Sequence, residues 1–282
     1  DTVQEDGWGT VWNVTSLADT STTAITLSVL VADQEGNVQS ESQTVRIGLD
    51  RRPPTQTTAI IGDPYTETMT VTISSLSATD PSPGSGVHAV AFSNDGWAWE
   101  GEDLHHESGE EVADPEALNG RAWRGLAAVH TAGSWYGPYT DVLPPGNAYR
   151  AYFRLKTTDV LTTAEVAMLE VVDSAGTRLL GLRRLRGTDF RAANVYQEFP
   201  VDLIADAAGL EFRTAFRATA DLYLDRVLVV GYPIDITDSV SWQLSPGEGI
   251  KTVTVKFVDR AGNVSADLIT TVTLSDTTPP GG

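Results

Sequence analysis

The sequence predicts an all-β protein built from sandwich domains. Hydrophobic and polar residues alternate along many short segments, which is the pattern of half-buried strands. One unit of the chain occurs twice, and no segment keeps the 3.6-residue period of a long helix. The best helical candidate is short, Asp202 to Ala208. We therefore expect sheets joined by turns rather than a helical core.

The repeated unit runs from Val29 to Pro54 and again, 226 residues later, from Val255 to Pro280. The copies align without a gap and match Asp33 with Asp259, Gly36 with Gly262, Asn37 with Asn263, Val38 with Val264, Asp50 with Asp276, Pro53 with Pro279 and Pro54 with Pro280. Each copy predicts a β-hairpin, because Asp-x-x-Gly-Asn suits a type I turn whose Gly takes a positive φ. Calcium binding is the alternative for these Asp and Asn residues, but turn chemistry accounts for them.

Composition excludes several classes of function. The chain has 282 residues, no Cys and a formal net charge of −19. Disulfides, thiol nucleophiles and Cys-ligated metals are therefore absent. The negative charge repels phosphate backbones, so we expect no nucleic-acid partner. No stretch approaches the roughly 18 apolar residues of a membrane span, and the first residues lack a signal-peptide pattern, so a secreted protein would be in its mature or excised form.

Two separate segments resemble the halves of the Ig-like repeats found in large bacterial surface and secreted proteins. The matching residues of the first half are Ala78 to Gly86, Val90, Phe92 and Ser93 to Gly96, and those of the second half are Trp242, Pro246 to Gly249, Asp259 to Val264 and Asp276 to Pro280. Residues 55–100 and 237–280 together number 90, close to the ~100 residues of one Ig-like sandwich. The resemblance implies a discontinuous Ig-like sandwich, residues 55–100 plus 237–282, and an extracellular or cell-surface bacterial location.

Residues 1–54 match only the second half of such a repeat. A half-sandwich leaves open strand edges and an uncovered apolar face. We expect this segment to pack on the next domain, to be completed by another segment, including one from a second copy through self-association, or to be less well ordered. The remaining residues, 101–236, are enough for a domain inserted at an exposed hairpin tip of the discontinuous sandwich.

The inserted segment resembles galactose-binding-like jelly rolls, which include many carbohydrate-binding modules. The resemblance rests on Pro145-Gly146 leading into a strand from Tyr149 to Arg154, and on Leu222 to Val227 as a closing strand. Further strands are expected at Glu165 to Asp173, Leu179 to Leu185, Tyr196 to Leu203 and Leu210 to Phe216. The resemblance implies a jelly-roll β-sandwich with a polysaccharide or glycan as its partner.

Sugar binding needs flat aromatic rings beside polar groups. The densest group of aromatic side chains is Trp135, Tyr136 and Tyr139, with Trp123 and His130 upstream. These five residues are the candidate ligand-binding site. The alternative is that Trp123 and one or two of the other rings fill the core of the sandwich.

The jelly-roll resemblance also implies a structural calcium ion, although no cofactor is required. Such modules hold the ion with an early acidic segment and the Asp of the last strand, and calcium takes six to eight oxygen ligands. The matching residues are Glu107, Glu110, Glu111, Asp114 and Asp225, with Glu110-Glu111 in place of a Glu-x-Glu opening.

We expect no catalytic activity, because no carboxylate pair, nucleophile elbow or phosphate-binding loop stands in a recognisable motif. The leading hypothesis is a non-catalytic, extracellular carbohydrate-binding segment in which Ig-like spacers present the jelly roll. The alternative is a structural or adhesive surface stalk, or a filament-forming protein, without a glycan ligand. An accessory region of a larger secreted glycan-degrading enzyme is compatible with the first hypothesis.

Overall fold

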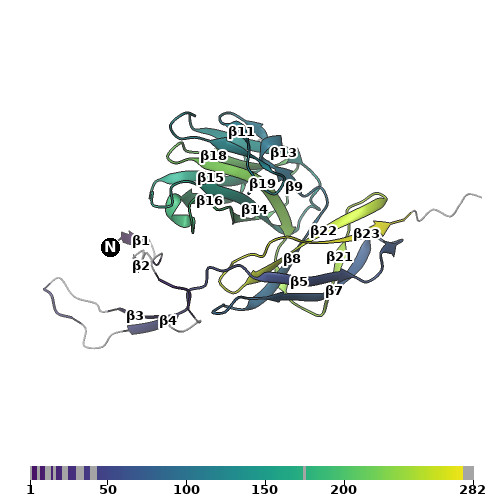
Figure 1. Ribbon diagram of the computed structural model, residues 1–282, viewed down its shortest axis with the longest axis horizontal. Helices are drawn as coiled ribbons and strands as arrows, with labels where there is room; N and C mark the ends of the chain where they lie inside the picture. Colours follow the sequence, from purple (N-terminus) through teal and green to yellow (C-terminus); the bar gives the residue numbers. More distant parts are fainter. Residues whose placement is uncertain are drawn as a thin grey trace, which may run out of the picture.

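The computed structural model describes residues 2–4, 7–9, 14, 17–20, 25–29, 35–38, 43–173 and 176–275. Within these residues the elements are strands and two short 3₁₀ helices, with no α-helix, which confirms the all-β prediction. A search of the same residues finds no helix with the length and hydrophobicity needed to cross a membrane. The strands build two sandwiches, with a pair of small hairpin sheets preceding them (Figure 1).

The discontinuous sandwich combines strands from both sides of the central part of the chain. Its strands are β5 (Thr55–Ile61), β6 (Tyr65–Thr66), β7 (Thr70–Thr79), β8 (Val87–Asn94), β20 (Ile234–Asp235), β21 (Ser239–Gln243), β22 (Gly249–Asp259) and β23 (Leu268–Leu274). One sheet has the order β20-β8-β22-β23-β6 and the other β21-β7-β5, with β23 and β6 as a parallel pair. Val253, Val255 and Phe257 alternate into its core and are fully buried, as the sequence pattern predicts.

The central sandwich is formed by the residues between β8 and β20. It comprises β9 (Ala98–Glu100), η1 (Gly101–Asp103), β10 (His105–His106), β11 (Glu110–Ala113), β12 (Arg121–Gly125), β13 (Gly133–Thr140), β14 (Ala148–Thr157), β15 (Glu165–Val172), β16 (Leu179–Arg186), η2 (Gly187–Asp189), β17 (Gln197–Ile204), β18 (Leu210–Phe216) and β19 (Leu222–Gly231). A five-stranded sheet, β10-β13-β18-β15-β16, packs on a six-stranded sheet, β11-β12-β19-β14-β17 with β9 beside β19.

Two details of the central sandwich differ from the sequence-based expectation. β17 runs through Asp202 to Ile204, so the start of the expected helix is strand, because Val201 and Leu203 are buried at alternate positions. The alternating pattern predicts that half-buried strands have one buried face, yet Tyr152, on the face opposite to Ala151 and Phe153, is also fully buried. It packs with Leu228 and Val230 of β19 and with Ala91 of β8, since this sheet face rests on the discontinuous sandwich.

Buried ion pairs and aromatic rings also join the two sandwiches. Lys256 of β22 has 1% of its side chain exposed and contacts Glu198 of β17 at 2.7 Å and Asp267 at 2.8 Å. Trp97 lies edge-on to Tyr149 and to Trp242, with ring centroids 5.5 and 6.0 Å apart. Trp97 and Trp242 therefore pack where the two sandwiches meet.

The described residues of the N-terminal part form two hairpins. Its strands are β1 (Thr2–Gln4), β2 (Gly7–Gly9), β3 (Ile25–Val29) and β4 (Gln43–Ile47), with β1 paired to β2 and β3 to β4. Val45 of β4 is 60% exposed. Ile25, Leu27 and Ile47 of the same hairpin are half-buried.

The repeated turn has the expected backbone geometry in both copies. Gly36 and Gly262 have φ of 86° and 84°, and the Asn263 N–H donates to Asp259 Oδ1 at 2.8 Å. Asp33, the counterpart of Asp259, lies outside the described residues.

Candidate functional site

Strand β13 sends neighbouring aromatic side chains to opposite faces of its sheet. Trp135 pairs with Thr214 of β18 and points into the core, where it is fully buried and stacks on Phe216 with centroids 5.5 Å apart. Tyr136 pairs with Arg213 and lies on the outer face. Trp135 was expected to contact a sugar, and the structure corrects that expectation, because a fully buried ring has no surface to offer a ligand.

Trp123 is likewise held against the core. Its Nε1 donates to the Ser108 carbonyl at 2.9 Å, and the Trp135 Nε1 donates to the same oxygen at 2.7 Å. The His106 ring stacks on Trp123 with centroids 3.5 Å apart, and burial lowers the pKa of His106. Both indoles therefore serve the packing of the sandwich, as the alternative interpretation of the sequence predicts.

His130 lies apart from the Tyr rings. Its Nδ1 accepts a hydrogen bond from the Leu126 N–H at 3.0 Å, closing the loop after β12. The ring contacts of Tyr136 and Tyr139 are with each other and with His105, and His130 takes no part in them.

Tyr136, Tyr139 and His105 form a partly exposed aromatic cluster on the outer face of the five-stranded sheet. The ring centroids are 5.5 Å apart for His105 and Tyr136, 6.0 Å for His105 and Tyr139, and 6.4 Å for the two tyrosines. The register of β13 shifts between Pro138 and Thr140, and Tyr139 has φ of 67°. A bulge of this kind re-aims a side chain, and here it leaves Tyr139 42% exposed beside Tyr136.

Charged groups adjoin the aromatic cluster. Arg213 donates to both carboxylate oxygens of the buried Glu211, and Glu170 of β15 lies opposite Arg213 in the register. Partial desolvation, then the charge of Glu211, raises the pKa of the Tyr139 hydroxyl. The face therefore combines flat rings with fixed donors and acceptors. We call His105, Tyr136, Tyr139, Glu211 and Arg213 the aromatic platform.

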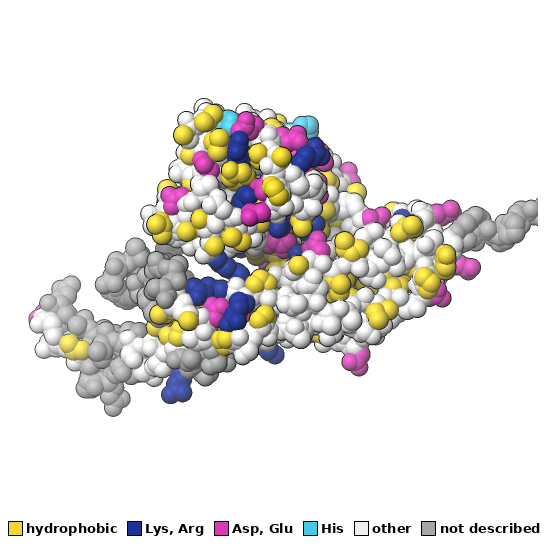
Figure 2. All heavy atoms as spheres, viewed as in Figure 1, with side chains coloured by type: hydrophobic (Ala, Val, Ile, Leu, Met, Phe, Trp, Pro, Cys, Tyr) yellow, Lys and Arg dark blue, Asp and Glu magenta, His cyan; other side chains and the backbone are white. Residues whose placement is uncertain are grey.

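His105, Glu211 and Arg213 are platform members outside the candidate ligand-binding site that the sequence predicts, and His105 is the aromatic one. It lies opposite Tyr136 because β10 pairs with β13, although the two strands are distant in the sequence. Nothing local in the sequence signals that pairing. Figure 2 shows histidine side chains among acidic and basic ones at the end of the central sandwich away from the discontinuous sandwich.

Comparison with solved structures finds carbohydrate-binding modules. The family 6 module of lichenase 5A from Cellvibrio mixtus, in complex with cellotriose, is 11% identical, with a TM-score of 0.35, over 47% of this chain and 94% of that one. A family 35 module from Clostridium thermocellum is 16% identical, with a TM-score of 0.34, over 48% of this chain and 98% of that one. No family model matches the sequence, and no curated protein matches it.

The carboxylates expected to hold calcium do not come together. Glu110 pairs with Arg124, Glu111 with Arg121, and Glu107 accepts from the Ser134 N–H. Asp114 pairs with Lys156 at 2.6 Å, and Asp225 with Arg154 at 2.7 Å. Each of these five carboxylates, Asp225 included, is paired with a cation or accepts a hydrogen bond elsewhere, so the expected ligands do not form one group.

Two other carboxylates lie beside Asp225. Glu100 pairs in register with Arg226, the residue after Asp225, and Glu102 follows in η1. Gly101 between them allows this approach, because a Cβ there would lie 2.2 Å from the Leu224 carbonyl oxygen. Burial, then the charge of Asp225, raises the pKa of Glu100 to about 7. The Glu-x-Glu opening that the jelly-roll resemblance implies is therefore Glu100-Gly101-Glu102, which spans the predicted domain boundary between residues 100 and 101.

Oxygen atoms in this acidic group lack partners. Glu100 Oε2 and Glu102 Oε2 are shielded from solvent and accept no hydrogen bond from the described residues. Glu102 Oε1 accepts a hydrogen bond from the Asn119 side chain at 2.7 Å and pairs with Arg121 Nε at 3.3 Å. Asp225 is fully buried and accepts from the Leu118 N–H. Buried carboxylate oxygens without donors are costly, and an oxygen-only donor set fits a calcium ion.

Proposed function

We propose that this chain is a non-catalytic, extracellular carbohydrate-binding segment that binds a glycan on the aromatic platform. The supporting observation is the exposure of the Tyr136, Tyr139 and His105 rings on one sheet face beside the Arg213–Glu211 pair. Aromatic faces stack on the apolar faces of sugar rings, while fixed donors and acceptors bind hydroxyls. The discontinuous sandwich holds this face away from the rest of the chain.

The ring angles indicate how a sugar chain would lie. Tyr136 and His105 are inclined by 34°, whereas Tyr136 and Tyr139 are inclined by 78°. One sugar ring cannot stack flat on both tyrosines. Tyr136 with His105 would hold one ring by its face, and Tyr139 would contact the edge of that ring or the neighbouring sugar unit.

Replacing Tyr136 or Tyr139 by alanine is expected to weaken glycan binding by at least about tenfold, because stacking and apolar burial worth about 1.4 kcal/mol are lost. The whole chain is first screened on an array of plant, microbial and marine glycans, and the best ligand is measured by isothermal titration calorimetry. Tyr65→Ala is the matched control, since Tyr65 is 66% exposed on the discontinuous sandwich.

Unchanged affinity in the double variant Tyr136→Ala/Tyr139→Ala would place the glycan elsewhere. No binding across the array by the wild-type chain would remove the proposed function. Thermal unfolding of each variant separates loss of contact from loss of fold.

We also propose that Glu100, Glu102 and Asp225 hold a structural calcium ion. The ion would supply positive charge to the two orphaned oxygens and fix η1 against the end of β19.

The pH dependence of stability tests the calcium site. Because the pKa of Glu100 is raised from 4.5 to about 7, the folded state retains a proton that the unfolded chain releases. With a chelator present, this contribution to stability is complete below pH 4.5 and is lost as the pH rises through about 7. Excess calcium is expected to abolish that loss and to stabilise the fold by about 2.7 kcal/mol at 100 times its dissociation constant.

Urea unfolding followed by tryptophan fluorescence measures this effect. Glu102→Gln should gain less from calcium than the wild type, whereas the exposed-residue control Glu248→Gln should gain as much. Equal gains in Glu102→Gln and the wild type would contradict the site.

A second candidate function is a structural or adhesive stalk, favoured by the 60% exposure of Val45 on the N-terminal hairpin. An apolar residue on an exposed edge hairpin can pair with another copy. Concentration-dependent association in sedimentation velocity, together with an empty glycan array, would support the stalk over the carbohydrate-binding function. An accessory role in a larger secreted glycan-degrading enzyme is compatible with the first proposal.

A further inference from the structure

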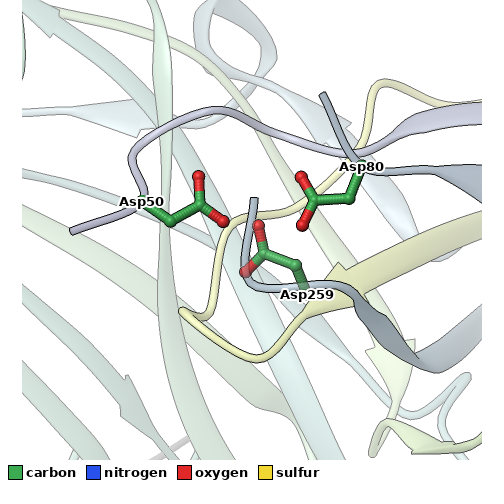
Figure 3. A group of neighbouring side chains, drawn as sticks. All are labelled: Asp50, Asp80 and Asp259. Carbon is green, nitrogen blue, oxygen red and sulfur yellow. The ribbon is translucent and has the colours of Figure 1, made fainter. Parts of the chain in front are cut away.

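Three aspartates bring negative charge to the place where the N-terminal part joins the discontinuous sandwich. Asp50 lies in the linker before β5, Asp259 ends β22, and Asp80, which accepts from the Gly86 N–H, follows β7. One oxygen from each carboxylate lies within 4.8 Å of the others, and Figure 3 shows the three side chains directed toward one another. We call these residues the junction aspartates. Like charges at this separation repel, so the linker carboxylate is driven away from the sandwich unless a positive charge is supplied.

Hydrogen bonds position the junction aspartates but do not neutralise them. The Ser85 N–H donates to Asp50 Oδ2 at 2.7 Å, and the Arg52 N–H donates to Asp50 Oδ1 at 3.1 Å. Asp259 accepts from the Asn263 N–H at 2.8 Å and from the Asn263 side chain at 2.7 Å. Burial raises the pKa of Asp259, the hydrogen bonds from Asn263 lower it, and the charges of the other two junction aspartates raise it again. The repulsion between the three carboxylates therefore remains.

Arg191 brings a positive charge from the central sandwich to this junction. It follows Phe190, which is buried and contacts Phe199 with ring centroids 4.6 Å apart. The Arg191 N–H donates to Oε1 of Gln197, the first residue of β17, at 2.9 Å. The loop after η2 is thus fixed to the core and to a strand, and the Arg191 side chain leaves it from a defined position.

The Arg191 guanidinium contacts both of the other parts of the molecule. It donates through Nη1 to the Arg51 carbonyl in the linker and through Nη2 to Asn263 Oδ1 in the discontinuous sandwich. The Asn263 side chain in turn donates through Nδ2 to the Asp50 carbonyl at 3.2 Å. Loss of solvent lowers the pKa of Arg191, while the charges of Asp259 and Asp50 act in the opposite direction. Arg191 therefore connects three parts of the chain and offsets negative charge where they meet.

We propose that Arg191 is a positioning residue that locks the N-terminal linker against both sandwiches. Its charge offsets the repulsion between Asp50 and the two aspartates of the sandwich, and its two hydrogen bonds fix the direction in which the linker leaves. The linker carries the N-terminal hairpins, so their orientation relative to the central sandwich depends on this side chain. Arg191 would then set the direction in which the aromatic platform faces, a consequence that rests on the proposed function, whereas the lock itself does not.

Pairs of introduced cysteines measure the lock without a glycan, because the chain has no Cys of its own. Spin labels at Thr44→Cys on β4 and at Thr163→Cys on the central sandwich report the distance between these parts of the full-length chain by double electron–electron resonance. We expect a narrow distance distribution with Arg191 in place and a broad or shifted one in Arg191→Gln, because Gln supplies no charge and is too short to span both acceptors. Arg191→Lys keeps the charge but only one contact, and its distribution should lie between the two.

A second label pair separates loss of the lock from loss of the fold. Glu248→Cys with Thr163→Cys reports the distance between the two sandwiches, which the Lys256 ion pairs join independently. That distance should stay the same in Arg191→Gln. The matched control Arg186→Gln replaces an exposed arginine at the end of β16 and should leave both distances unchanged.

Removal of the linker charge tests the electrostatic part of the lock. Asp50→Asn reduces the repulsion that Arg191 offsets, so Asp50→Asn/Arg191→Gln should have a narrower distribution than Arg191→Gln alone. An equally broad distribution in the double variant would contradict the role of the Arg191 charge. A broad distribution with Arg191 in place, or the same narrow distribution in Arg191→Gln, would overturn the lock. Failure of the wild-type chain to bind any glycan would remove only the consequence for the aromatic platform.

Discussion

Replacing Trp135 by alanine is expected to destabilise the central sandwich by about 3–5 kcal/mol, the range for deleting a buried large aromatic ring. The side chain is fully buried, stacks on Phe216 and donates to the Ser108 carbonyl. Its removal leaves a cavity between the two sheets and takes one donor from that oxygen. Urea unfolding followed by circular dichroism should show a lower midpoint with an unchanged slope.

Trp135→Phe keeps most of the ring volume and should cost less than Trp135→Ala. Both variants should bind glycan in proportion to the fraction that is folded, because the ring faces the core rather than the platform. A Trp135→Phe protein of wild-type stability that has lost glycan binding would contradict this assignment.

Replacing Lys256 by methionine is expected to destabilise the chain by about 3–5 kcal/mol, as when one partner is removed from a buried ion pair. The Nζ atom donates to both oxygens of Glu198 and to the Ser265 carbonyl. Burial raises the pKa of Asp267, but the charges of Lys256 and Arg226 outweigh it and hold that pKa below 3.8. Without Lys256 the Glu198 carboxylate stays largely buried and loses its main counter-ion.

Lys251→Met provides the matched control for Lys256→Met. Lys251 is a buried lysine on the same strand, β22, but it donates to a backbone carbonyl, that of Pro246, within its own sandwich. Differential scanning calorimetry should show the two sandwiches unfolding in separate steps in Lys256→Met and together in Lys251→Met. Equal behaviour of the two variants would show that the Glu198 contact does not couple the sandwiches.

Strand periodicity predicted most of the fold. Ala151, Phe153 and Leu155, and likewise Val253, Val255 and Phe257, are buried at the alternate positions that the sequence indicates. The pattern could not show that Tyr152 is buried, because that depends on which sheet face meets another domain. It also could not decide between Trp135 and Tyr136, since adjacent rings in one strand differ only in the face they occupy.

The candidate sites were harder to predict because their residues are distant in sequence. Tyr136 and Tyr139 were recognised as a dense aromatic segment, whereas His105 depends on the pairing of β10 with β13. Glu100 and Glu102 stood at the assigned boundary, and only the pairing of β9 with β19 brings them to Asp225.

The discontinuous sandwich also determines how the molecule would respond to mechanical tension. The chain enters it through β5 and leaves it through β23, while the central sandwich is covalently inserted between β8 and β20 (Figure 1). A pulling force on both ends therefore passes through the discontinuous sandwich and bypasses the central one. The central sandwich would keep its shape on a stretched tether until the discontinuous sandwich itself gave way.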